Sequence, residues 1–369
     1  MDRLRLAPIP AALPATVPFT GPEALERRRG APFRARLGAN ENGFGPSPRA
    51  IEAMARAAAE VWKYADPDSH DLRAALAARH RTDPRHVMVG EGIDGLLGLL
   101  VRLTVAPGEV VVTSRGAYPT FNYHVAGFGG RLSLVDYRAD AEDPEALVDA
   151  AARDGARLVY LANPDNPMGS HHPGARIEAM LDALPPGVLL VLDEAYAEFA
   201  PPEALPRIDP ADDRVIRMRT FSKAYGMAGA RVGYALGPAA LIAAFDRVRN
   251  HFGMNRIAQV GALAALADRD WLNEVRARVA GARDRITAIA AACGLRALPS
   301  ATNFVAIDCG ADGDFARRVL AGLDREGVFV RMPGVAPLDR CIRISCGPEA
   351  DLDVLAEALP RALAFARRG

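Results

Sequence analysis

Lysine occurs only at Lys63 and Lys223 in this chain of 369 residues, although Lys and Arg together number 45. A lysine can lose its proton and attack a carbonyl carbon, whereas an arginine stays protonated. Lys223 follows Thr220 and Ser222 and precedes a glycine-bearing segment and Arg231. The hydroxyls and the guanidinium suit a phosphate, and the amine suits an aldehyde on the same molecule. This segment predicts a site for pyridoxal 5′-phosphate, and Lys63 is interpreted as a surface residue.

Asp193 ends the aliphatic run 188–192, so its carboxylate is expected to emerge from the centre of a sheet. Desolvation there is costly unless a cation pairs with it, and a protonated pyridine nitrogen is such a cation. A protonated ring stabilises the carbanion formed when an amine loses its α-proton. An aspartate that caps the next helix is the alternative interpretation. Tyr196 and Asn166 could hydrogen-bond the ring's phenolic oxygen.

Other residues add weaker signals. The backbone amides of Ile93 and Asp94 follow a glycine turn at the start of an apolar helix, where a phosphate can bind. Phe121 could stack on a flat ring, although an aromatic residue is more often core. Arg331 and Arg343 could each hold a carboxylate or a phosphate with two hydrogen bonds. Arg343 lies in the apolar sequence CIRIS, where a charge needs a partner.

Short apolar runs alternate with alanine-rich segments of helical period, which predicts a mostly parallel sheet flanked by helices. The predicted strands are 86–89, 109–113, 131–135, 157–161, 188–192, 215–218 and 232–236. The predicted helices include 47–62, 71–81, 93–103 and 144–153. The candidate residues follow strand ends, where open α/β sheets bind ligands. We assign this pattern to a large domain, residues 46–255.

The pattern changes after residue 255. A long Ala/Arg helical stretch runs to about residue 292, and strand candidates follow at 303–307, 328–331 and 341–345. This pattern predicts a smaller α+β domain over residues 256–369. Residues 1–45 are interpreted as an N-terminal arm that contributes to the small domain or packs on a partner subunit. Four prolines interrupt its apolar stretch, which disfavours a secretory signal.

The composition excludes several classes of protein. Lys+Arg and Asp+Glu are both 45, so the chain lacks the basic field that nucleic acid or an anionic membrane requires. No apolar run approaches the roughly 18 residues of a membrane span. The four cysteines have no CxxC spacing, and the seven histidines show no metal-binding pattern. We expect a cytoplasmic protein with reduced thiols and no metal.

Taken together, these segments resemble the fold-type I pyridoxal-phosphate aminotransferases of class I/II, most closely the histidinol-phosphate aminotransferase branch. The resemblance runs almost end to end. The motifs that carry it are VPFTGPEALER, LGANENGFGPSP, YADPD, GEGIDGLLGLL, YPTF, NPDNPMG, VLDEAYAEF, RTFSKAYGMAGARVGY, GVFVR and IRISCG.

The resemblance implies a role for each candidate residue. Lys223 would form a Schiff base with the cofactor and then move the proton of the amino donor. Asp193 would pair with the pyridine nitrogen, Asn166 and Tyr196 would hold the ring oxygen, and Phe121 would stack on the ring. The phosphate would be held by the backbone of Ile93 and Asp94 and by Thr220, Ser222 and Arg231. Tyr64 of YADPD would reach the phosphate from a second subunit of a homodimer.

The resemblance also implies the substrates. Arg343 and Arg331 would bind the phosphate of histidinol phosphate, and Arg343 would bind the carboxylate of an amino acid. The predicted reaction transfers an amino group between histidinol phosphate, or an aromatic or similar amino acid, and 2-oxoglutarate. Several positions differ from the branch pattern: Phe19 replaces a Tyr, Gly43 replaces a Pro, Met168 replaces a Thr, and Gly95 replaces an acidic residue. These differences bear on the choice of donor.

Two other functions are weighed against this one. A decarboxylase of a phosphorylated amino acid would use the same lysine and aspartate. A non-catalytic binding or regulatory protein could keep the fold, but the lysine argues against it. A nicotinamide dehydrogenase is a more distant alternative, because the GxGxxG dinucleotide motif is missing.

Overall fold

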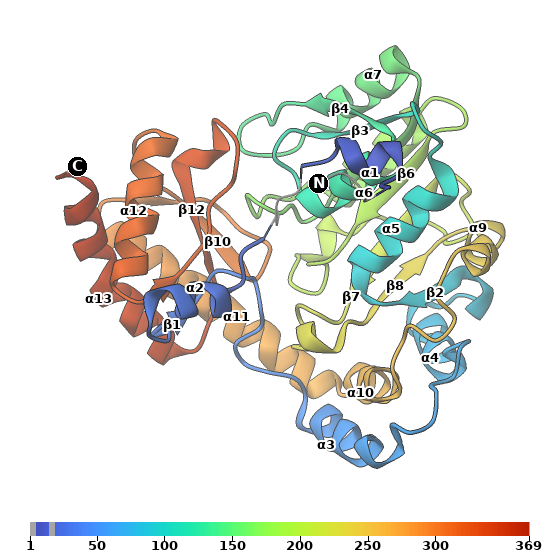
Figure 1. The fold of residues 1–369 in the computed structure, drawn as a ribbon, viewed down its shortest axis with the longest axis horizontal. Helices are drawn as coiled ribbons and strands as arrows, with labels where there is room; N and C mark the ends of the chain where they lie inside the picture. The colour runs from blue at the N-terminus through green and yellow to red at the C-terminus, as the bar shows by residue number, and fades with distance from the viewer. Residues whose placement is uncertain (1–4, 15–18, 369) are drawn as a thin grey trace.

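The computed structural model describes residues 5–14 and 19–368. Figure 1 shows two lobes, a larger one around a seven-stranded sheet and a smaller one around a three-stranded sheet, which we call the large and small units. The large sheet has the order β2-β8-β7-β6-β5-β3-β4. Its strands are β2 (Val87–Gly90), β3 (Val110–Ser114), β4 (Arg131–Val135), β5 (Ala156–Ala162), β6 (Leu189–Asp193), β7 (Val215–Thr220) and β8 (Gly233–Leu236). Only β8 runs antiparallel to its neighbours, so the predicted mostly parallel α/β sheet is confirmed.

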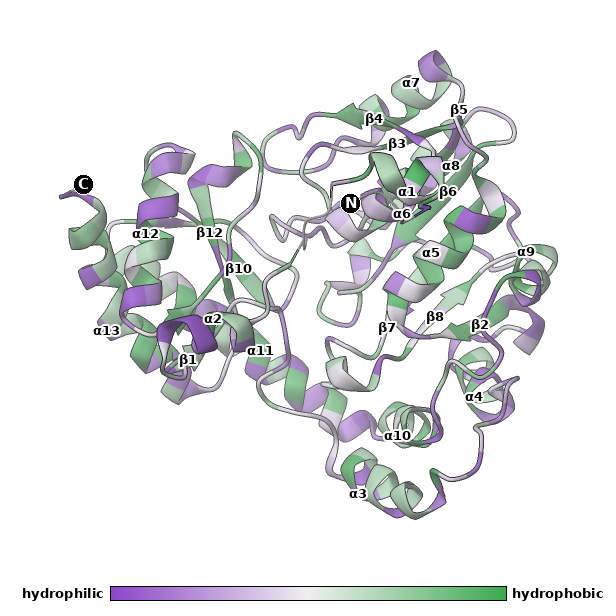
Figure 2. Ribbon diagram, in the orientation of Figure 1, coloured by the Kyte–Doolittle hydropathy of each residue, from purple (hydrophilic) through white to green (hydrophobic). Residues whose placement is uncertain are grey.

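Helices cover both faces of this sheet because its central strands are apolar on both sides. In β5, Leu158 and Tyr160 pack in one cluster with side chains of α5 and α6, whereas Val159 and Leu161 pack in another with α7 and α8. Figure 2 shows the hydrophobic character of the central strands and of α5. The helices of this unit are α5 (Gly92–Thr104), α6 (Pro119–Gly127), α7 (Pro144–Asp154), α8 (Gly174–Ala183) and α9 (Ala239–Ala244).

The small unit is antiparallel. Its sheet consists of β9 (Arg296–Ala297), β10 (Phe304–Asp308) and β12 (Cys341–Ser345), in the order β12-β10-β9. Its helices are α11 (Arg269–Ala292), α12 (Gly313–Arg325) and α13 (Glu349–Ala366). A separate parallel pair joins β1 (Ala35–Arg36) to β11 (Val328–Phe329), so a segment near residue 35 lies beside one near residue 328.

The predicted long helix after residue 255 is two helices, α10 (Arg256–Ala267) and α11. They separate at Asp268, whose side chain accepts a hydrogen bond from the Trp271 amide and one from the Ser47 hydroxyl at 2.5 Å. α10 packs against α3 (Pro48–Ala57) and α4 (His70–His80) of the large unit, and α11 carries the chain into the small unit (Figure 1). The predicted division places α10 in the small domain, whereas α10 packs on the large unit. The division into residues 1–45, 46–255 and 256–369 stays a prediction.

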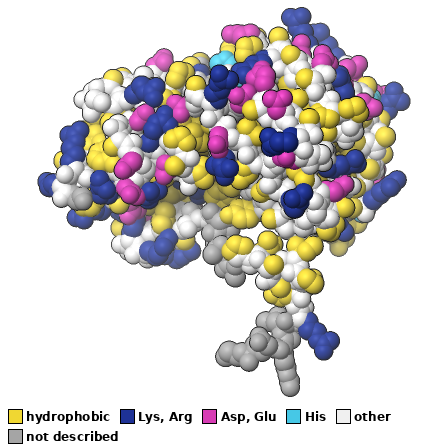
Figure 3. Space-filling view, turned by 90° about the horizontal axis from the view of Figure 1, so that it is seen from above, with side chains coloured by type: hydrophobic (Ala, Val, Ile, Leu, Met, Phe, Trp, Pro, Cys, Tyr) yellow, Lys and Arg dark blue, Asp and Glu magenta, His cyan; other side chains and the backbone are white. Residues whose placement is uncertain are grey.

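Two further helices, α1 (Pro8–Ala12) and α2 (Pro22–Arg29), lie near the N-terminus. On the face of the molecule in Figure 3, positive and negative side chains are interspersed. None of the helices in residues 5–14 and 19–368 is long and apolar enough to cross a membrane. The same residues contain no group of three or more His, Cys, Asp or Glu side chains that could bind a metal ion.

Candidate active site

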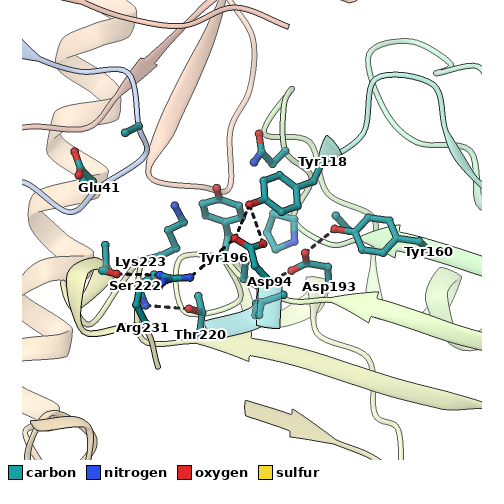
Figure 4. Close-up of a pocket in the computed structure, with 17 residues that line it drawn as sticks. Glu41, Asp94, Tyr118, Tyr160, Asp193, Tyr196, Thr220, Ser222, Lys223 and Arg231 are labelled. Carbon is teal, nitrogen blue, oxygen red and sulfur yellow. Dashed lines mark hydrogen bonds and ion pairs between the residues drawn. The ribbon is translucent and has the colours of Figure 1, made fainter. Parts of the chain in front are cut away.

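A cavity of about 250 Å³ lies where β5, β6 and β7 end and α5 begins. This is the edge of the sheet where ligands bind in open α/β folds. The predicted site residues that line it are Ile93, Asp94, Asn166, Asp193, Tyr196, Thr220, Ser222, Lys223 and Arg231. In Figure 4, Lys223 and Asp193 lie on opposite sides of the cavity with Tyr196 between them.

The amine of Lys223 faces the cavity and has few polar contacts in the described residues. Its Nζ donates to the carbonyl oxygen of Asn40 at 3.2 Å and lies 5.7 Å from the centre of the Tyr196 ring. Burial lowers the pKa of the Lys223 amine to about 8, and the Arg343 guanidinium acts in the same direction. A neutral amine is therefore accessible near neutral pH. Lys63 differs, because it is exposed and pairs with Glu60.

Asp193 is a buried carboxylate that forms no ion pair within the described residues. Its Oδ2 accepts a hydrogen bond from the Tyr160 hydroxyl at 2.6 Å, and its Oδ1 accepts one from the Ala195 amide at 2.9 Å. Burial raises the pKa of the Asp193 carboxyl to about 6, although both hydrogen bonds act against this change. A cation in the cavity would stabilise the charged carboxylate.

The corner of the cavity formed by Thr220, Ser222, Arg231 and the start of α5 fits a phosphate, and we call it the phosphate corner. The Arg231 Nη1 donates to the Ser222 hydroxyl at 3.3 Å, and the Thr220 hydroxyl accepts from the Ser222 amide at 3.0 Å. Gly92 has φ +78°, and a Cβ there would lie 2.5 Å from the Arg231 Nη2. Only glycine leaves this space beside the first amides of α5, those of Ile93 and its neighbour.

Two further side chains at the cavity, Tyr196 and Asn166, could hydrogen-bond an oxygen on the ring of a bound ligand. The Tyr196 hydroxyl accepts a hydrogen bond from the Asn40 amide at 3.0 Å, and burial raises the Tyr196 pKa. The Asn166 Oδ1 accepts from the Arg343 Nη1, which leaves the amide nitrogen of Asn166 as a donor. The amine, the buried carboxylate, the phosphate corner and these two groups together fit pyridoxal 5′-phosphate.

The prediction for Phe121 is wrong. Phe121 is completely buried and stacks on Tyr160, with ring centres 4.5 Å apart and planes 18° apart. Tyr118 lines the cavity instead, and its hydroxyl donates to Asp94 at 2.9 Å. The cause is local, because α6 begins at Pro119 and turns Phe121 into the core while Tyr118 stays at the sheet edge.

The two predicted substrate arginines lie next to the cavity rather than in its lining. Arg343, on β12, has its guanidinium 5.1 Å from the Phe304 ring, and its Nε is buried without a partner among the described residues. Arg331 is joined to Arg343 by backbone hydrogen bonds. The Arg331 guanidinium donates to the carbonyl of Thr20 and lies 5.2 Å from the Phe19 ring.

Tyr64 does not line this cavity. It is 78% exposed, and its ring packs against Phe252 with centres 4.7 Å apart. Its predicted contact with the phosphate from a second subunit stays a prediction.

Sequence reasoning missed four residues of the site, namely Asn40, Glu41, Tyr118 and Tyr160. Asn40 and Glu41 lie in the segment NEN just before Gly43, and nothing in that segment alone indicates a role at the site. The signal for Tyr118 was the proline after it, since proline favours the first turn of a helix.

Comparisons with known proteins give a consistent result. The model of the family "Aminotransferase class I and II" matches residues 35–359. Histidinol-phosphate aminotransferase of Rhodospirillum centenum is 36% identical, with 88% of this chain and 90% of that protein covered. The structure of histidinol-phosphate aminotransferase from Sinorhizobium meliloti in complex with pyridoxal 5′-phosphate is 57% identical, has a TM-score of 0.95 and covers 98% of both chains. Aspartate aminotransferase from Thermus thermophilus with maleate is 25% identical, with a TM-score of 0.81 and coverage of 98% and 100%.

Proposed function

Because the chain belongs to the aminotransferase class I and II family, which depends on pyridoxal 5′-phosphate, we propose that it transfers the amino group of histidinol phosphate to 2-oxoglutarate. The observation that carries the proposal is the pairing of Lys223 and Asp193 across one cavity. Asp193 is buried and Lys223 is partly buried, and neither has an oppositely charged partner in residues 5–14 and 19–368. A ligand with an aldehyde and a basic ring nitrogen would satisfy both.

The cofactor supplies an electron-poor ring that accepts electrons from the Cα–H bond of the amino donor. Asp193 would hold the proton on the ring nitrogen. Tyr196 and Asn166 would hydrogen-bond the ring oxygen, and Arg231, Ser222 and the first amides of α5 would hold the phosphate. Tyr118, in place of Phe121, has the ring that can stack on the cofactor.

Lys223 has two tasks. Its Nζ would hold the cofactor at the aldehyde carbon, and as a free neutral amine it would accept the proton from Cα of the amino donor. A general base is most effective when its pKa lies near the working pH, and the Lys223 pKa of about 8 meets this condition. Arginine could not perform either task.

The substrates that we propose are inferred from the two arginines and from the relatives, which are histidinol-phosphate aminotransferases. Arg343 and Arg331 lie side by side, and two guanidiniums suit a phosphate or a carboxylate. Histidinol phosphate would offer its phosphate, and glutamate would offer a carboxylate to Arg343. Glu41 lines the cavity without a hydrogen bond from its side chain in the described residues, and its carboxylate can accept the N–H of an imidazole.

We also propose a homodimer. Several large apolar side chains are exposed around residues 61–64 and in the nearby segments before and in α10, and such patches mark interaction sites. They are Val61, Trp62, Tyr64, Phe252 and Val260. A second copy that covers this patch would bring its Tyr64 toward the phosphate corner of the first.

The test is a half-reaction screen. The purified holoenzyme is mixed separately with histidinol phosphate, Phe, Tyr, Arg and Glu, and the visible absorption of the bound cofactor is followed. We expect histidinol phosphate and Glu to bleach it, with formation of the matching oxo product. Release of carbon dioxide without an oxo product would instead support a decarboxylase.

A further inference from the structure

Tyr160 is a buried tyrosine whose position the proposed roles do not use. It lies in β5, is completely buried and lines the cavity. Its ring stacks on Phe121, which fixes the plane of the ring and the direction of its hydroxyl. The side chain is therefore held rigidly beside the ligand.

The hydroxyl of Tyr160 donates to Asp193 Oδ2 at 2.6 Å, a distance typical of a hydrogen bond to a charged oxygen (Figure 4). The Ala195 amide holds the other carboxylate oxygen at 2.9 Å. With both oxygens held by the protein, the carboxylate cannot rotate, and its remaining lone pairs keep one direction.

This hydrogen bond also affects where a shared proton rests. Between a pyridine nitrogen and a carboxylate, the proton stays on the stronger base. Burial strengthens the Asp193 carboxylate as a base, and the nearby charges of Asp94 and Glu194 add to this effect, whereas the Tyr160 hydroxyl weakens it. Loss of the hydroxyl would therefore shift the shared proton toward the Asp193 oxygen, which favours a neutral pair over a charged one.

We propose that Tyr160 is a positioning residue for the reaction, whose hydroxyl fixes the Asp193 carboxylate so that the proton stays on the pyridine nitrogen of the cofactor. This inference rests on the proposed binding of pyridoxal 5′-phosphate. It does not depend on which amine is the donor.

The experiment compares Tyr160→Phe with Tyr234→Phe. Tyr234 is a matched control, because it is also buried in the large sheet and its hydroxyl is hydrogen-bonded to His80 at 2.9 Å, away from the cavity lining. Both variants keep the ring and lose one side-chain hydrogen bond. Each apoprotein is titrated with pyridoxal 5′-phosphate labelled with ¹⁵N in the ring, and the dissociation constant and the ¹⁵N chemical shift are measured.

We expect Tyr160→Phe to weaken cofactor binding about tenfold, as the loss of a hydrogen bond to a charged group does. Its ¹⁵N shift should move toward that of neutral pyridine. Tyr234→Phe should keep the wild-type shift and affinity while lowering the melting temperature. In an Asp193→Asn background, Tyr160→Phe should have little further effect on affinity, because its action runs through the carboxylate.

An unchanged ¹⁵N shift and affinity in Tyr160→Phe would overturn the inference, as would an equal loss of affinity in Tyr234→Phe. A wild-type protein that binds no cofactor would contradict the proposed function itself. The two failures are therefore distinguishable.

Discussion

Asp193 and Glu194 are neighbours at the end of β6, and they have opposite electrostatic environments. Asp193 faces the cavity without a cation, whereas Glu194 accepts hydrogen bonds from Arg217 at 2.8 and 3.0 Å and from Arg219 at 2.9 Å. Burial would raise the pKa of the Glu194 carboxyl, but the two arginines overcome burial and lower it to about 2. Burial raises the pKa of Asp193 to about 6.

This difference in environment indicates that the charge of Glu194 stabilises the fold, whereas the charge of Asp193 is available to a ligand. Strand alternation sends the two side chains to different faces of the sheet. On one face the protein completes the ion pairs itself, and Glu198 adds to them through Arg219 at 3.3 Å. At the cavity, the charges of Asp193 and Lys223 are left for a ligand to complete. Substitutions on the two sides should therefore have different consequences.

The largest effect is expected from Lys223→Arg. The variant keeps a positive charge in the cavity, but the guanidinium cannot give up its proton. Transaminase activity should fall by about 10⁴-fold or more, since both covalent attachment and general base catalysis are lost. Steady-state rates with histidinol phosphate measure this. Circular dichroism should show unchanged folding, and retention of more than a tenth of the activity would contradict the assignment of Lys223.

Glu194→Gln tests the structural side. It leaves Arg217 and Arg219 without their buried carboxylate, and breaking a buried pair in this way costs about 3–5 kcal/mol. Urea unfolding at pH 7 measures the loss. The cofactor affinity of the folded variant should stay close to wild type. A Glu194→Gln variant as stable as wild type would show that the ion pairs of Glu194 with Arg217 and Arg219 do not stabilise the fold.

Asp193→Asn should have the opposite effect on the apoprotein. Because the folded pKa of Asp193 lies above the unfolded one, the folded state binds more protons between about pH 4 and pH 6. Wild-type stability therefore falls relative to the variant as pH rises through this window. Above pH 6 the apo variant should be more stable by roughly 1–3 kcal/mol. Thermal melts of both apoproteins at pH 4, 5, 6 and 7 measure the difference, and a constant difference would contradict it.

The smallest effect should come from Tyr118→Phe. The ring remains, but its hydrogen bond to Asp94 is lost, so we expect cofactor affinity to fall by about threefold to tenfold. Phe121→Leu is the contrasting variant. It should cost about 1–2 kcal/mol of stability through lost packing and leave the affinity unchanged. The reverse pattern would restore Phe121 as the stacking residue.

Much of the fold could be predicted from the sequence. The seven predicted strands of the large sheet lie within two residues of β2 to β8, because apolar runs between turns mark buried parallel strands. The site residues that follow those strands, such as Asp193 and Lys223, were found from the same pattern and gather in one cavity.

The rest depended on information that is not local. The pairing of β1 with β11 joins residues far apart in the chain, and nothing in either segment marks the other. The break at Asp268 depends on Ser47, which lies in another segment. Tyr160 looked like a core residue because it interrupts no apolar pattern, and only its hydrogen bond to Asp193 distinguishes it.

The pairing of β1 with β11 has a consequence for how the protein is made. Residues 35 and 36 leave the ribosome early, and their partners at 328 and 329 follow roughly 300 residues later. At about 5–20 residues per second, the early strand waits some 15–60 s. During this time the large sheet can form, since its strands lie between residues 87 and 236. The segment that carries Asn40, and so the carbonyl that holds Lys223, gains this strand partner only near the end of synthesis.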